Sequence, residues 1–415
     1  MATAISRPTA PLAVRRHGVV LTGAILTFLT FFTIAFPKGG IKIYEIPITF
    51  GYLFTAAMLL WAMLRADGLS IPLDRLLAFA PCLLLGLWSA LVVAINGSES
   101  FGYTLSYFTS VLYLPLFGLA FFAPAILDDH GHRIERAIVW AVRLIVVYGI
   151  FLFLFKQFTG SWIEVPYLTV NVADAGQLDD KFINRGGVFK LISTYNNGNI
   201  FGVSLAILAP LYLRLENRKI LHWAVYAAMF LTLSRTAWIA AIMIMALRSL
   251  SKGVRPITLL YLAGGILLAG AAVVGLLSFL GRDLGFIFDS DLGGRADQLR
   301  VLNDISLIPD EPVSALPEIV YLGVLEFFGI LGLALFVAHL LVPSLILMAE
   351  GVRIFSLSRA SACLHGLLIY LVIAGADAAY SYIPVMMIFW MVAGMGFWYA
   401  RRQAVLVKGP REAAR

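Results

Sequence analysis

Charged residues are scarce in this chain of 415 residues. Asp, Glu, Lys and Arg make up 13% of it and hydrophobic residues 60%, and the mean hydropathy is +0.89. A soluble domain has about a quarter of its residues charged, so this composition excludes an ordinary soluble protein. The net charge of +7 does not indicate a nucleic-acid partner, because in a membrane protein the positions of the cations matter more than their sum. The sequence predicts a polytopic membrane protein.

The chain also has few residues suited to metal binding or redox chemistry. Its two cysteines, Cys82 and Cys363, both lie within apolar segments, which favours packing over a disulfide. His130 and His132 stand close together without a further histidine or cysteine nearby, so they do not indicate a zinc site. Neither a Walker lysine motif nor an HExxH motif occurs. We therefore expect no metal and no other cofactor.

What the chain has instead is a series of apolar runs of membrane length. A helix needs about 20 residues to cross the bilayer core, and we predict an all-α fold with about twelve transmembrane helices. The predicted spans lie near residues 18–36, 46–64, 76–95, 104–127, 134–158, 197–213, 219–234, 235–250, 256–280, 327–349, 361–379 and 383–400. Arg15 and Arg16 precede the first run and no small-residue cleavage site follows it, so we expect a retained span and not a signal peptide.

The positions of Lys and Arg predict the orientation of these spans. With the amino terminus in the cytoplasm, cytoplasmic segments hold 20 of the 31 cations and outer loops hold 8, in agreement with the positive-inside rule. Residues 219–250 form either one long span or two short ones, and the charge bias favours two that meet at Ser234 and Arg235 on the outer surface. We expect one integral-membrane domain over the whole chain, with both termini cytoplasmic. Two long loops are predicted to be periplasmic, near 159–196 and 281–326.

One polar stretch, residues 181–202, interrupts the apolar pattern between the fifth and sixth predicted spans. It offers the cations Arg185 and Lys190, a pair of glycines, and amide side chains that include Asn196 and Asn199. Cations and amides at a membrane surface suit an anionic ligand that carries sugars. An ordinary connecting loop is the alternative interpretation.

Arg235 is the most informative single residue, because it lies between apolar runs. An arginine at mid-membrane costs at least about 2.5 kcal/mol on insertion scales, so it usually has a partner or a function. In the functional interpretation, Arg235 binds a phosphate group with Arg185 and either Arg295 or Arg300, since the guanidinium fork donates two parallel hydrogen bonds to an oxyanion. In the alternative, Arg235 extends to lipid headgroups.

Three carboxylates near the same predicted face are candidates for a general base: Glu318, Glu326 and Asp377. Glu318 directly follows Pro317, where the second long loop returns to the membrane, and a glutamate partly removed from water is suited to accept a proton. A structural role is the alternative for each of the three. Arg143 lies within the fifth predicted span, where it is placed to pair with a neighbouring helix.

Three short motifs follow one another in the second half of the chain. They are Arg185 with the Asn-Asn-Gly-Asn entry to the next span, a Ser-Arg-x-x-Trp element at 234–238, and YLGVLEFFGILGL at 321–333. In their order and in the topology around them, they resemble the bacterial O-antigen polymerase and O-antigen ligase superfamily (Wzy-like and WaaL-like proteins). The resemblance covers about residues 180–350, and the first five spans are similar to the family only in hydropathy.

This resemblance implies a metal-independent membrane glycosyltransferase with a polyprenyl-diphosphate-linked glycan as donor. Family members are expected to bind the donor diphosphate with loop arginines. The ligases carry a His-Asn pair at positions that correspond here to Glu318 and Ile319. The ligase histidine is therefore absent, which favours a polymerase.

We therefore predict an inner-membrane polysaccharide polymerase, of the O-antigen or exopolysaccharide kind. It would transfer a glycan from polyprenyl diphosphate to a lipid-linked repeat unit, with membrane lipids and other polysaccharide-assembly proteins as partners. The predicted catalytic residues are Glu318 as the base and Arg185 and Arg235 at the diphosphate. The further predicted contacts to the diphosphate and the glycan are Lys190, Asn196, Asn199, Arg295, Arg300 and Glu326.

Two alternatives stay open. An O-antigen ligase would transfer the glycan to lipid A core or to a protein. A lipid-linked glycan flippase would need charged residues along a central cavity, whereas the charges here gather on the predicted outer face.

Overall fold

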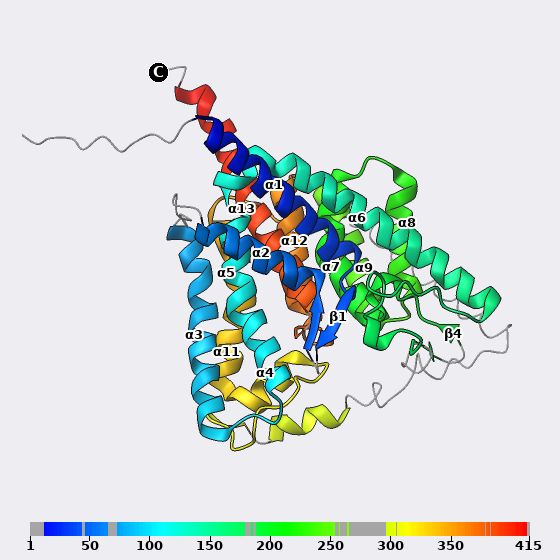
Figure 1. The fold of residues 1–415 in the computed structure, drawn as a ribbon. Coiled ribbons are helices and arrows are strands. Elements are labelled where there is room, and N and C mark those ends of the chain that lie inside the picture. The colour runs from blue at the N-terminus through cyan, green and yellow to red at the C-terminus, as the bar shows by residue number, and fades with distance from the viewer. Residues whose placement is uncertain are drawn as a thin grey trace, which may run out of the picture.

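Most of the described polypeptide is helical and it has almost no sheet, as Figure 1 shows, and the all-α prediction is confirmed. The structure is a computed structural model, and it describes residues 12–43, 46–64, 73–178, 184–185, 188–253, 257, 264, 296–303, 305–377, 379–381 and 383–412. The first part of the chain contains α1 (Leu12–Ala35), β1 (Gly40–Ile43), β2 (Ile46–Thr49), α2 (Phe50–Leu64), α3 (Leu73–Asn96), α4 (Phe101–Phe108), the π-helix η1 (Thr109–Tyr113), α5 (Leu114–Phe121) and α6 (Pro124–Thr159). The second part contains η2 (Val172–Asp174), β3 (Asn184–Arg185), β4 (Val188–Phe189), η3 (Ser193–Tyr195), α7 (Gly198–Leu215), α8 (Lys219–Leu231), α9 (Arg235–Ser251), η5 (Ala296–Asn303), α11 (Val320–Ala349), α12 (Arg359–Ile373) and α13 (Ile383–Glu412).

Several of these helices are long and apolar enough to cross a membrane. Within the described residues there are five such stretches: Arg75–Asn96, Phe101–Phe121, Ile126–Thr159, Gly198–Leu215 and Val320–Ala349. Shorter apolar helices cover Thr22–Ala35, Phe50–Leu60, Lys219–Leu231 and Arg359–Ile373. This content agrees with the prediction of a membrane protein. The predicted span 256–280 lies outside the described residues, apart from Ile257 and Gly264.

One pair of predicted boundaries is wrong. The sequence suggested that a span ends near residue 127 and that the next begins near 134, whereas α6 is one helix of 36 residues from Pro124 to Thr159. The chain instead turns at Phe122 and Ala123, before Pro124, which is favoured in a first helical turn. The polar residues after it remain helical because they have partners on other helices. Asp128, for example, accepts a hydrogen bond from the indole N–H of Trp398 in α13 (2.8 Å).

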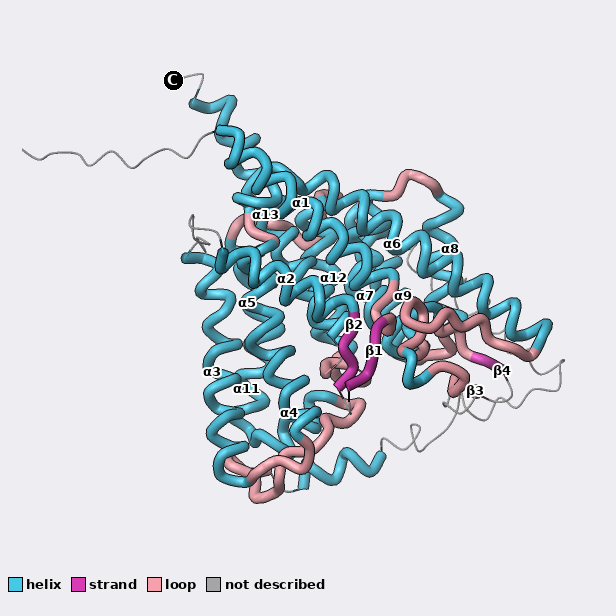
Figure 2. The backbone as a smooth tube through the Cα atoms, viewed as in Figure 1, coloured by secondary structure: helices cyan, strands magenta, loops and turns pink. Residues whose placement is uncertain are grey.

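Both β-hairpins lie at the same end of the helix bundle, here called the hairpin end (Figure 2). β1 and β2 are antiparallel, as are β3 and β4, and Gly40 of β1 also pairs with Asn171 in the connection after α6. The segment 305–319 lies at this end as well (Figure 2), where the backbone N–H of Glu99 donates to the carbonyl of Val313 (3.0 Å). The described parts of both long connections thus emerge at one end of the bundle.

Helix α12 lies between α7 and α11 and sets their positions at the hairpin end. Gly366 packs against α7 so closely that a Cβ atom there would lie 2.3 Å from the carbonyl oxygen of Ile207. The two contacting residues are near the middle of their helices. The end of α7 and the beginning of α12 also line one pocket, so the two helices run in opposite directions. At the hairpin end, the Tyr321 hydroxyl of α11 donates to the Leu371 carbonyl of α12. The beginnings of α7 and α11 therefore flank the last turn of α12.

Helix α11 is broken at Gly329, whose φ of 67° and ψ of −172° lie outside the helical region. The indole N–H of Trp88 donates to the Phe328 carbonyl (2.8 Å), and the Ile330 N–H donates to the Ser306 carbonyl (3.0 Å). A Cβ atom on Gly329 would lie 2.2 Å from the Leu307 carbonyl oxygen. Only glycine fits this backbone and this contact, and the segment before α11 is thereby joined to the break.

An ion pair between a half-buried arginine and a buried carboxylate joins α6 to the end of α7. Arg143 donates from Nε to Glu216 (2.6 Å), which confirms the expected pairing of Arg143 with a neighbouring helix. Glu216 also accepts from the Tyr212 hydroxyl (3.1 Å) and from the backbone N–H of Arg218 (2.9 Å). Burial alone raises the pKa of this carboxyl, but these hydrogen bonds outweigh it and lower the pKa to about 2. Arg143 thus has a structural role.

Candidate functional site

The polar stretch before α7 folds against the turn between α8 and α9. The backbone N–H of Leu191 donates to the Leu231 carbonyl (2.9 Å). A Cβ atom on Gly198 would lie 3.1 Å from the Thr232 carbonyl oxygen and 3.5 Å from the Cβ of Lys190. These contacts bring Lys190, the beginning of α7 and the beginning of α9 together at the hairpin end. We call this region, Lys190 with residues 196–199 and 232–235, the α7–α9 corner.

Small residues and an asparagine cap allow the two helices to begin so close together. The Asn197 side chain caps α7 by accepting from the N–H groups of Asn199 (2.8 Å) and Ile200 (3.3 Å). Asn196 adopts the left-handed conformation (φ 55°), which asparagine tolerates. One turn into α7, a Cβ atom on Gly202 would lie 2.6 Å from the Ala237 Cβ, so only a glycine permits this approach of α7 to α9.

The beginning of α9 differs from that of α7 in having no side-chain cap. Ser234 occupies the capping position, but its side chain makes no capping hydrogen bond. The first N–H groups of a helix lack partners within the helix, and they attract anions when no cap satisfies them. Leu233, directly before this point, has a φ of 52°, a conformation that an apolar side chain rarely adopts and that is concentrated at functional sites. Arg235, half-buried, is the first residue of α9.

Two further side chains give the α7–α9 corner a polar character. Asn199 lies in the first turn of α7, and its buried Oδ1 atom has no hydrogen-bond partner among the described residues. Lys190 is half-buried and contributes a second positive charge. Two cations, an uncapped helix terminus and an amide that lacks one partner together form an arrangement that can bind a large anion.

The remaining predicted site residues do not all join this corner. Asn196 uses its amide N–H to donate to the Thr169 carbonyl (3.1 Å), so it holds the loop. Arg300 is exposed and pairs with Asp297 (2.9 Å). The backbone of Arg185 pairs with Val188 in the β3–β4 hairpin, but its side chain is outside what the structure describes. Arg295 also lies outside the described residues.

Two of the three carboxylate candidates lie at the beginning of α11, whereas Asp377 is buried after the end of α12. Glu318 is exposed just before α11, and Glu326 is half-buried in its second turn. The side chain of Gln298, in η5, accepts from the N–H of Ile319 (3.2 Å), which ties η5 to the beginning of α11. The last turn of α12 lies between this helix beginning and the beginning of α7. The two groups of candidates therefore share the hairpin end.

The sequence interpretation missed what Ser193, Thr194 and Tyr195 do. They belong to the polar stretch 181–202, but all three are buried. The Ser193 hydroxyl donates to the Ile145 carbonyl (2.7 Å) and the Tyr195 hydroxyl to the Ile34 carbonyl (3.0 Å). These residues anchor the loop to α6 and α1, and no local pattern in the sequence signals those distant acceptors.

Lys156 was also missed. It is buried at the end of α6, where it donates to the Gly160 carbonyl (2.7 Å). Its ammonium group also lies 5.0 Å from the centre of the Trp162 ring and 4.7 Å from that of Phe189, at cation–π distance. These contacts hold β4 against the end of α6 and thereby position the loop that leads to Lys190.

Within the described ranges, no three His, Cys, Asp or Glu side chains are grouped as ligands for a metal ion. Comparisons of the chain with protein-family models, with curated proteins and with solved structures find no match.

Proposed function

We propose that the protein is a membrane glycosyltransferase that polymerises a polysaccharide from polyprenyl-diphosphate-linked repeat units. The observation that carries this proposal is the uncapped beginning of α9, with Arg235 as its first residue and Lys190 beside it. A diphosphate is a dianion or more, and a helix terminus with two cations is suited to bind it. The corner lies at the end of the bundle where the two long connections emerge. These connections provide surface for the sugar portions of donor and acceptor.

The reaction exchanges one bond at the anomeric carbon of the donor glycan for another. The bond to the diphosphate oxygen breaks, and a hydroxyl of the acceptor sugar forms the new glycosidic bond. Negative charge develops on the leaving diphosphate, where Arg235, Lys190 and the N–H groups of α9 stabilise it. The proton of the acceptor hydroxyl passes to a carboxylate, to which we assign Glu318.

Transfer by the purified protein tests this function directly. The protein in liposomes is supplied with one polyprenyl-diphosphate-linked oligosaccharide repeat, and products are separated by size. A polymerase yields a ladder at multiples of the repeat. An O-antigen ligase gives product only when lipid A core or a protein acceptor is added. A flippase changes the side on which the glycan is accessible and leaves the length unchanged, and either of these two results would contradict the proposal.

The finer topology belongs to the same proposal: about twelve spans in a bacterial inner membrane, cytoplasmic termini, and a periplasmic hairpin end. Single cysteines at Gln177 or Asp310 should then react with an impermeant thiol reagent in intact spheroplasts, whereas one at Asn217, at the opposite end, should react only after permeabilisation. All three positions are exposed or lie in connections, and the native Cys82 and Cys363 are buried, so background labelling stays low. The reverse pattern would overturn the orientation and the periplasmic site with it.

A further inference from the structure

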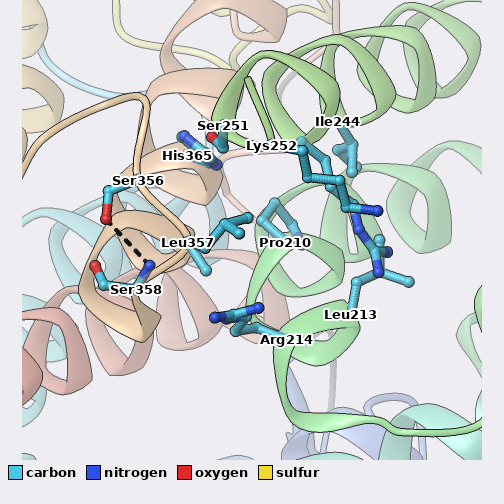
Figure 3. A pocket seen from close by; sticks show the side chains of 12 residues that line it. Pro210, Leu213, Arg214, Ile244, Ser251, Lys252, Ser356, Leu357, Ser358 and His365 are labelled. Carbon is cyan, nitrogen blue, oxygen red and sulfur yellow. Dashed lines mark hydrogen bonds between the residues drawn. The ribbon is translucent and has the colours of Figure 1, made fainter. Parts of the chain in front are cut away.

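A second cluster of cations lies at the opposite end of α7 and α9, away from the hairpin end. It surrounds a pocket formed by the last turns of these two helices, the connection between α11 and α12, and the first turns of α12 (Figure 3). The positively charged lining residues are Arg214, Arg248 and Lys252. The described lining contains no aspartate or glutamate.

The positive charge of the side chains around this pocket exceeds the net negative partial charge of the helix ends that meet there. The carboxyl-terminal ends of α7 and α9 each contribute roughly −0.5 charge, and the beginning of α12 contributes roughly +0.5. Together with the three side chains this leaves roughly +2.5 charges. A phosphate monoester carries about −1.5 to −2 charges at neutral pH. None of the three cations pairs with a described carboxylate. Arg248 donates a hydrogen bond to the His222 ring (3.3 Å), but this partner carries no negative charge, so the positive charges of the three side chains are available to a ligand.

Two serines add hydrogen-bond donors on the other side of the pocket. Ser356 accepts from the N–H of Ser358 (3.2 Å), and Ser358 accepts from the N–H of Ser361 (3.1 Å) as the cap of α12. No residue in the described part of the chain accepts a hydrogen bond from either hydroxyl. In Figure 3 these serines lie on one side of the pocket and Lys252 on the other. A ligand between them can therefore be contacted from both sides.

The volume of the pocket indicates how large a group fits inside it. Its inner space is about 60 Å³, and one water needs roughly 10–15 Å³ measured in this way. The space therefore holds a group of about five heavy atoms, which is the size of a phosphate. Leu213, Ile244 and Leu357 contribute apolar surface beside it, which suits a group attached to a carbon chain.

We propose that this pocket binds a phosphate group, supplied either by an anionic lipid headgroup or by a small soluble phosphate. The site is separate from the α7–α9 corner and does not depend on the glycosyltransferase proposal. Because α7 and α9 begin at the corner and end at the pocket, a bound phosphate braces the same two helices that form the corner. Its occupancy is expected to raise the thermal stability of the protein.

Thermal unfolding of the purified protein in detergent tests this proposal with two probes. One probe is inorganic phosphate at constant ionic strength against chloride, and the other is phosphatidic acid against phosphatidylcholine in mixed micelles. We expect the melting temperature to rise in a saturable way with at least one probe. A rise with both indicates a site for the phosphate alone, and a rise only with phosphatidic acid identifies a lipid site.

Matched variants distinguish specific binding in the pocket from non-specific attraction to the positive charge of the protein. Arg214→Gln with Arg248→Gln removes two pocket cations and should weaken probe binding about 100-fold, since a charge-assisted contact contributes roughly a factor of 10 or more. Arg353→Gln with Arg401→Gln removes two exposed cations outside the pocket lining and should leave binding unchanged. If the first double variant does not accumulate, Lys252→Gln replaces it, with an expected loss of about 10-fold. No saturable rise in the wild type, or equal loss in both pairs, would overturn the proposal.

Discussion

Replacing Arg235 by Lys is expected to slow glycan transfer roughly 30- to 1000-fold, with the protein accumulating as the wild type does. Lysine keeps the charge at the beginning of α9 but lacks the planar fork that donates two parallel hydrogen bonds to one phosphate. In the proposed reaction these bonds strengthen as charge develops on the leaving diphosphate, so their loss lowers the rate more than it weakens substrate binding. The measurement is the initial rate of ladder formation by purified protein at saturating donor.

Arg300→Lys is the matched control for this prediction. Arg300 belongs to the same end of the bundle and was also a candidate from sequence, but it is exposed and pairs with Asp297. An exposed pair of this kind contributes little to stability, and we expect this variant to retain nearly the wild-type rate. Wild-type turnover in Arg235→Lys would mean that Arg235 is a membrane anchor and that the diphosphate binds elsewhere.

Charge and hydropathy predicted the helices of this protein better than its interior contacts. The separation of α8 from α9 at Ser234 and Arg235 followed from the distribution of Lys and Arg. A single span over residues 219–250 would have placed the later basic segments on the outer side of the membrane, against the positive-inside rule. Apolar length similarly indicated α3, α7 and α11. These features are local or cumulative along the chain, so they can be read from the sequence without knowledge of which helices pack together.

The features that the sequence did not reveal depend on partners far along the chain. Ser193 and Tyr195 are polar residues that point inward because carbonyl groups of α6 and α1 accept from them. Asp128 lies within a helix and not between two spans, and the distant Trp398 donates a hydrogen bond to it. Gly329 belongs to the motif at 321–333, but the motif did not reveal that α11 is broken there. The break is held by hydrogen bonds with Trp88 and Ser306, which lie outside the motif.

In the candidate site, too, some features were predictable from the sequence and others depended on distant contacts. The proximity of Lys190 to the beginning of α9 was expected only as a clustering of cations on one face, and the structure adds the actual contacts through Gly198. The uncapped state of α9 was not predictable, because serine at position 234 is among the residues that usually cap a helix. Whether such a serine caps depends on the backbone before it, which here includes Leu233 in the left-handed region.

Replacing Glu318 by Gln is expected to lower the rate of transfer about 100-fold, the lower end of the range for general base catalysis. Glutamine keeps the shape and the hydrogen bonding of the side chain but cannot take the proton of the acceptor hydroxyl. The competing interpretation is that Glu318 only stabilises the beginning of α11, where a carboxylate near the first turn contributes about 0.3–1 kcal/mol. In that case the variant unfolds slightly earlier and turns over at the wild-type rate.

Three further substitutions make this test specific to Glu318. Glu311→Gln changes an exposed glutamate in the same connection and should leave the rate unchanged. Glu318→His should retain part of the activity, because imidazole also accepts a proton and the O-antigen ligases that the sequence resembles are expected to carry a histidine at the corresponding position. Glu326→Gln, at the half-buried glutamate of α11, separates the two carboxylates. A large loss in Glu326→Gln with none in Glu318→Gln would transfer the role of base to Glu326 and leave the diphosphate site at Arg235 as proposed.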